Sequence, residues 1–157
     1  MSPAAAKTKS EMNEPLSIWH TRPDISALNA LHDNTAVAHL GIRITVVGDD
    51  FLTGTMPVDA RTVQPAQLLH GGASVLFAET IGSAAANHCV DMAVSMCVGL
   101  EINANHVRGV RSGMVTGTAR AVHLGRRSQI WEIRIVDDRD ALVCIARLTS
   151  TVVDRAT

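Results

Sequence analysis

Three polar side chains, Glu79, Ser83 and Asn87, follow one another at four-residue spacing in a segment that is otherwise apolar or small. Residues 71–87 have the composition of a helix buried on every side, and residues four apart on a helix project in nearly the same direction. An ionised carboxylate removed from water is costly unless partners or water meet it. The polar stripe on an apolar helix therefore makes Glu79 a candidate functional residue. The alternative is that Glu79 lies on a solvent-facing edge of the helix.

The head of this helix carries the run His70, Gly71 and Gly72. Two glycines let a ligand approach the backbone, and the first helical turn offers N–H groups without intrahelical partners at the positive end of the dipole. Such a site stabilises a carbonyl oxygen that gains negative charge, as in a thioester under attack. Gln64, in the preceding loop, and His70 could join Glu79 there. The alternative is that the glycines only permit a tight turn and that Gln64 and His70 are structural.

The elements that must position these residues are one long helix and about six strands. Alternating residues predict a hairpin over residues 41–58, turning at 48–50, and four later strands over the ranges 95–107, 114–123, 129–137 and 141–153. The predicted fold class is α+β, with an antiparallel sheet curled around the central helix. Pairing of subunits would cover the apolar surface that one sheet leaves open.

Two short helices are predicted ahead of the hairpin, in residues 24–42. Asp24 can cap the first of them, and Ile25, Leu28 and Leu31 fall on one of its faces. A break is expected near residues 33–34.

Length and charge restrict the class of protein. A chain of 157 residues fits one domain, here residues 15–157, behind a flexible polar tail over residues 1–14. The net charge of -1 predicts neither a nucleic-acid nor a membrane surface. The tail has no apolar run behind its lysines, and no later segment supplies about 18 uninterrupted apolar residues, so we expect a cytoplasmic protein.

The sequence predicts no cofactor and no metal site. His70 and Glu79 are not spaced as helical metal ligands, and no third ligand completes a set with them. Cys89, Cys97 and Cys144 are odd in number and widely spaced, which indicates reduced thiols in the core.

The chain resembles the hotdog-fold acyl-CoA thioesterases in three runs, QPAQLLHGGASVLFAETIGSAA, VGLEINANHVRGVRSGMV and AVHLGRRSQIWEIRI. The similarity covers residues 18–153. It is greatest to the branch that contains the 1,4-dihydroxy-2-naphthoyl-CoA hydrolases of menaquinone synthesis and the proofreading thioesterase of enterobactin synthesis. The resemblance implies a hotdog fold, a dimer that is required for the site, and dimers paired into tetramers.

The resemblance also implies residue roles. The carboxylate matching Glu79 is the nucleophile or general base and faces the loop of the other subunit. Gln64 would place water, His70 would orient the thioester, Gly71 would supply the oxyanion N–H, and Ser83 would support the leaving thiolate or the carboxylate. The segments that bind CoA in the family match Gly99, Asn105, His106, Val107, Arg108, Gly109, His123, Leu124, Gly125, Arg126, Arg127 and Ser128. Among these, three arginines, Arg108, Arg126 and Arg127, are suited to phosphate contacts.

We therefore predict an acyl-CoA thioesterase that releases free acid and CoA. An aromatic acyl group is expected, such as 1,4-dihydroxy-2-naphthoyl or a benzoyl type. Close relatives often have Phe-Gly where this chain has Ala66 and Gln67, so the wall of the acyl pocket is expected to be wider or more polar here.

Two other classes of hotdog protein are the alternatives. One is a non-catalytic acyl-CoA-binding module. Residues 1–40 are too short and too weakly basic for the DNA-binding segment of such regulators. The other is a hotdog hydratase, which relies on an Asp or His pair at other positions along the helix.

Overall fold

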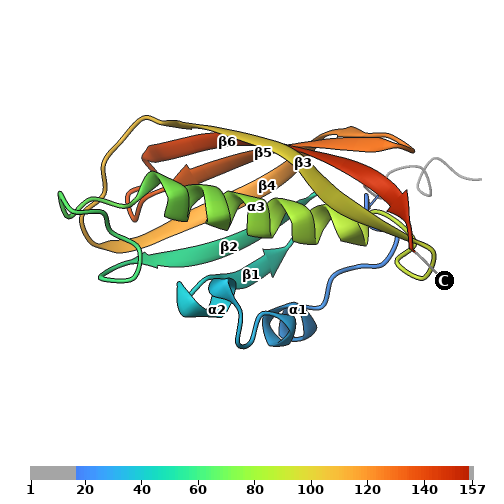
Figure 1. Cartoon of the computed structure of the whole chain (residues 1–157), viewed down its shortest axis with the longest axis horizontal. Coiled ribbons are helices and arrows are strands. Elements are labelled where there is room, and N and C mark those ends of the chain that lie inside the picture. The colour runs from blue at the N-terminus through green and yellow to red at the C-terminus, as the bar shows by residue number, and fades with distance from the viewer. Residues whose placement is uncertain (1–16, 156–157) are drawn as a thin grey trace, which may run out of the picture.

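Within the described part of the chain, six strands form one antiparallel sheet, and a single long helix lies against one of its faces (Figure 1). The computed structural model describes residues 17–155, so the predicted tail over residues 1–14 lies outside the described residues. The strands are β1 (Arg43–Val47), β2 (Phe51–Val58), β3 (Ser95–His106), β4 (Gly113–Leu124), β5 (Ser128–Val136) and β6 (Leu142–Asp154). Their order across the sheet is β1-β2-β4-β5-β6-β3, which leaves β1 and β3 at the two edges.

The long helix, α3 (Gly71–His88), packs on the sheet through one face. That face consists of Ala73, Ser74, Phe77, Ala78, Ile81, Gly82, Ala85 and Ala86, all of which are buried. The polar residues Glu79, Ser83 and Asn87 are half-buried, and Glu79 and Asn87 face the edge strand β3. One sheet covers only one side of the helix, so the burial on every side that the composition of α3 indicates would require the pairing of subunits expected from the sequence.

The two short helices, α1 (Ile25–Leu31) and α2 (Ala36–His39), lie outside β1 and α3. The Asp24 side chain caps α1 by accepting a hydrogen bond of 2.8 Å from the Ala27 N–H, as predicted. Of the three apolar residues assigned to one face of α1, only Leu28 is buried. Leu31 is 75% exposed because α1 ends there and the chain turns away from β1.

The cysteines are free, with Cys97 and Cys144 buried and Cys89 half-buried. Burial raises the pKa of all three thiols, that of Cys89 to about 12, with a smaller contribution from the neighbouring Cys97. The prediction of reduced core thiols agrees with this arrangement. No helix within residues 17–155 is long and apolar enough to cross a membrane.

Candidate active site

The loop before α3 is tied down so that the head of the helix is presented at the surface. The Thr62 side chain donates to the Pro57 carbonyl at 2.7 Å, and the His70 N–H donates to the Thr62 carbonyl at 2.8 Å. His70 is the N-cap, and its Nδ1 accepts a hydrogen bond of 2.8 Å from the Gly72 N–H. Since Nδ1 is the acceptor, the neutral ring carries its proton on Nε2.

The Gly71 N–H remains available for a ligand: within residues 17–155 it donates to no protein acceptor. A Cβ at position 71 would lie 2.9 Å from Nε2 of His106, at the end of β3. Glycine is therefore the residue that keeps this N–H accessible beside the imidazole. The position has the two properties that an oxyanion site needs, a free backbone donor and the positive end of a helix.

Gln64 and the β3–β4 connection lie beside this helix head. The Leu69 N–H donates to the Val110 carbonyl at 2.7 Å, which joins the loop to residues 107–112. The Gln64 Oε1 accepts from the Ala66 N–H at 2.6 Å, so the amide NH₂ group is left to hold a water or a substrate. We call Gln64, His70, Gly71 and residues 105–109 the helix-head cluster.

Glu79 belongs to a second group of residues, further along α3. Its Oε1 accepts a hydrogen bond of 3.2 Å from the Ser83 hydroxyl. The same oxygen faces Gly99 of β3, where a Cβ would lie only 2.4 Å away. A side chain at position 99 would displace the carboxylate, so Gly99 bears on the catalytic candidate as well as on the CoA contact implied by the family. We call Glu79, Ser83 and Gly99 the carboxylate cluster.

The two clusters are separated within one chain. Gly71 and Glu79 are eight positions apart on α3, which corresponds to about 12 Å along the helix axis. Reacting atoms must approach to about 3–3.5 Å. One chain therefore cannot place a single carbonyl both at the Gly71 N–H and at its own Glu79 carboxylate.

The predicted CoA-binding residues are separated in the same way. Residues 123–128 form the end of β4, the β4–β5 turn and the start of β5. In this turn the Arg127 carbonyl accepts from Val152 at 3.0 Å, and Val152 pairs with Cys97 near the start of β3. Residues 105–109 instead follow the other end of β3. In Figure 1 the β4–β5 turn and the β3–β4 connection accordingly lie at opposite ends of the molecule.

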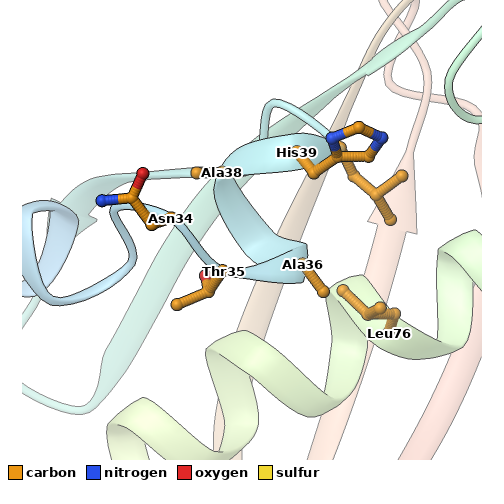
Figure 2. A pocket seen from close by; sticks show the side chains of 7 residues that line it. Asn34, Thr35, Ala36, Ala38, His39 and Leu76 are labelled. Atoms are coloured by element: carbon orange, nitrogen blue, oxygen red, sulfur yellow. The ribbon is translucent and has the colours of Figure 1, made fainter.

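A hollow of about 740 Å³ opens between α2 and α3 (Figure 2). Its lining residues are Asn34, Thr35, Ala36, Ala38, His39, Leu40 and Leu76. Leu76 precedes Glu79 by three positions on α3, and residues three apart on a helix are surface neighbours. The hollow therefore reaches α3 one turn before Glu79, which is not among its lining residues.

Sequence reasoning missed two contacts in this region. Gly99 was expected only as a CoA contact, although a glycine within an alternating strand also signals a close approach of another group. Asn87 was recognised as part of the polar stripe, but its partner on β3 was not. Its side chain bonds to the backbone of Cys97, a pairing between distant segments for which no local pattern exists.

Comparisons with known proteins agree with this fold. Residues 66–144 match the family model described as the thioesterase superfamily. The chain is 50% identical to the 1,4-dihydroxy-2-naphthoyl-CoA hydrolase of Escherichia coli, over 86% of this chain and 98% of that protein. It is 48% identical to the proofreading thioesterase EntH of Cronobacter turicensis, with the same coverage of 86% and 98%.

A crystal structure of a mutant thioesterase from Pseudomonas aeruginosa has a TM-score of 0.87 to this chain at 52% identity, covering 88% of this chain and 100% of that one. The chain belongs to the thioesterase superfamily and has its hotdog fold. It is accordingly an enzyme of the thioesterase class, as its sequence predicts.

Proposed function

We propose that the protein hydrolyses an aromatic acyl-CoA in a site built between two copies of the chain. The observation that carries this proposal is the separation of the two clusters. The carboxylate cluster and the β4–β5 turn lie toward the start of β3, whereas the helix-head cluster and residues 105–109 lie at its end. A second copy, related by two-fold symmetry, supplies each half with its complement.

The free edge of β3 offers the contact for this pairing. β3 lies at the edge of the sheet, with β6 on its other side. It exposes apolar side chains, among them Leu100, which is 66% exposed, and Val98. Exposed apolar surface next to an open strand edge favours burial against a partner.

Two-fold symmetry determines which residues would meet. Two β3 strands that pair antiparallel about a point midway between Gly99 and His106 place Gly99 beside the partner's His106. Glu79 contacts Gly99, and Gly71 contacts His106, so Glu79 of one copy approaches the partner's Gly71. The same operation brings the β4–β5 turn toward the partner's Arg108, which unites the two sets of CoA-binding residues.

The chemistry of the composite site follows from its groups. The thioester carbonyl oxygen accepts from the partner's Gly71 N–H at the positive end of α3, which stabilises negative charge on that oxygen. Glu79 either attacks the carbonyl carbon or removes a proton from a water held by the partner's Gln64. A C–O bond forms and the C–S bond breaks. The acyl group leaves as the free acid after hydrolysis, and CoA leaves as the thiol once its sulfur is protonated.

Two observations support an aromatic acyl group. The Escherichia coli relative is named for its aromatic substrate. The hollow beside α3 has apolar walls at Ala36, Leu40 and Leu76, one turn from the carboxylate, and offers room for a ring system. Ala66 and Gln67, where relatives often have Phe-Gly, are exposed in this chain.

Thiol release tests the proposal directly. Wild type is compared with Glu79→Gln on benzoyl-, hydroxybenzoyl-, dihydroxynaphthoyl- and fatty acyl-CoA, and Glu132→Gln, a surface change on β5, is the matched control. We expect turnover of the aromatic thioesters to fall by about 10²-fold or more in Glu79→Gln and to stay unchanged in the control. Binding of the thioesters without release of thiol by wild type would instead favour the acyl-CoA-binding module. Faster release from fatty acyl-CoA would overturn the aromatic assignment.

The pairing of dimers into tetramers stays a prediction. Sedimentation of the wild-type chain distinguishes a dimer from a tetramer, and a monomer at catalytic concentrations would contradict the composite site.

A further inference from the structure

An asparagine side chain occupies each of the two edges of the sheet in the same manner. At the β1 edge, Asn29 donates to the Ile44 carbonyl at 2.9 Å and accepts from the Ile44 N–H at 2.9 Å. At the β3 edge, Asn87 donates to the Cys97 carbonyl at 3.2 Å and accepts from the Cys97 N–H at 2.9 Å. Each amide thus takes up the donor and the acceptor that an added strand would use.

Asn87 makes one contact more than Asn29 does. Its Nδ2 also donates to the Ser83 carbonyl at 3.0 Å, and the Ser83 hydroxyl donates to Glu79 Oε1 at 3.2 Å. Asn87 thus connects the backbone of β3 to the backbone of Ser83, the residue whose hydroxyl bonds to the carboxylate.

The position of β3 beside the carboxylate depends on the same side chain, Asn87. Gly99 lies two positions after Cys97 on β3 and faces Glu79 Oε1 so closely that no Cβ fits between them. A small shift of β3 relative to α3 would either press Gly99 into the carboxylate or open a gap beside it. Asn87 connects the two elements within two residues of this contact.

We propose that Asn87 is a positioning residue for the Glu79 carboxylate. Its side chain connects β3 to α3 at Cys97. Because the N–H and C=O of Cys97 are already hydrogen-bonded to Asn87, a second copy can pair with the β3 edge only beyond Cys97, from Gly99 onward. Pairing is thereby confined to the stretch whose midpoint aligns Gly99 with the partner's His106. The effect of Asn87 on catalysis rests on the proposed thioesterase site, whereas the connection that Asn87 makes between α3 and β3 does not.

The test compares Asn87→Ala and Asn87→Asp with Asn29→Ala as the matched control. Asn29→Ala removes the same pair of backbone hydrogen bonds at the other edge, away from Glu79. We expect Asn87→Ala to lower kcat of thiol release by about 10-fold or more, with KM within about twofold, because small displacements of a reacting group are costly. Asn87→Asp keeps the acceptor for the Cys97 N–H but sets a carboxylate oxygen against the Cys97 and Ser83 carbonyls, so its kcat should also fall by about 10-fold or more. Asn29→Ala should keep kcat within about twofold of wild type.

Hydrogen exchange of the backbone amides separates positioning from a general loss of stability. In the Asn87 variants the Cys97 amide and the amides of residues 98–101 and 79–83 should exchange faster than in wild type. Faster exchange at Cys97 with an unchanged kcat overturns the proposal, and so does an equal loss of kcat in Asn29→Ala. If Asn87→Ala fails to fold, Asn87→Asp carries the same comparison.

The two proposals can fail independently. If wild type releases no thiol from any acyl-CoA, the proposed function fails. Hydrogen exchange of the backbone amides in the Asn87 variants still tests the connection between α3 and β3. Faster exchange across residues 98–101 and 79–83 then supports the role of Asn87 in connecting α3 and β3, and faster exchange confined to Cys97 overturns it.

Discussion

Two inactive variants, Glu79→Gln and His70→Ala, should recover activity when their chains are mixed. Within one chain, Glu79 and the Gly71 N–H are eight positions apart on α3, about 12 Å along the axis, whereas reacting atoms must come within about 3–3.5 Å. If each site takes Glu79 from one copy and His70 from the other, a mixed dimer has one intact site and one doubly altered site. Random pairing of equal amounts makes half of the dimers mixed, so activity should reach about one quarter of wild type.

The assay co-expresses the two variants with different tags, or refolds them together, and measures thiol release from benzoyl-CoA. Each variant alone should retain about 1% of wild-type turnover or less. A mixture of Glu79→Gln with Glu79→Ala, which alters the same half of the site twice, should show no recovery. If the first mixture stays at the mean of its two residual activities while mixed dimers are present, the composite site is refuted.

Three further predictions concern single residues. Gly99→Ala should lower kcat by about 10²-fold, because its Cβ would lie 2.4 Å from Glu79 Oε1. Steady-state kinetics together with a thermal melt would measure this effect, and an unchanged kcat would contradict the contact. Gln67 is exposed with a φ of 59°, so Gln67→Gly should raise the free energy of unfolding by about 0.5 kcal/mol in urea titrations. The relief of backbone strain exceeds the conformational entropy that the new glycine loses on folding. A decrease in the free energy of unfolding would contradict this. The hydrogen-bonded Arg61 guanidinium lowers the pKa of Asp59 to about 2, so the pair stabilises the fold above the unfolded pKa and this contribution is lost as pH falls from about 4 to about 2. Urea midpoints over that range should fall more steeply in wild type than in Arg61→Ala, and parallel curves would show that the pair contributes nothing.

Much of the fold follows from local periodicity. Alternating residues set off by turn residues predicted the hairpin at residues 41–58 and the four later strands, and the observed strands agree within about two residues. The cap at Asp24 was likewise evident from residue type and position. These features depend on neighbours in the chain, so the chain alone reveals them. The composition of α3 is that of a helix buried on every side, whereas the sheet of one chain covers one side of it, and covering the rest is left to the predicted pairing of subunits.

Some features of the candidate site are likewise visible in the sequence, whereas others appear only in the folded structure. The spacing of Glu79 and Ser83 on one helix face, and the two glycines after His70, are visible in the sequence, and the structure shows the corresponding hydrogen bond and free N–H. The closeness of Gly99 to the carboxylate and of His106 to Gly71 joins segments far apart in the chain. Packing of β3 against α3 decides such contacts.

The amino-acid sequence by itself determined the elements, the residue types and the thioesterase family, since helix spacing, strand alternation and glycine placement act over a few residues. Only the tertiary structure decided that the carboxylate lies against Gly99 and the helix head against His106, at different places on the open β3 edge. The reason is physical: the register between a helix and a strand is set by the contacts that they make after the chain has folded, at Asn87 and Gly99 in this protein.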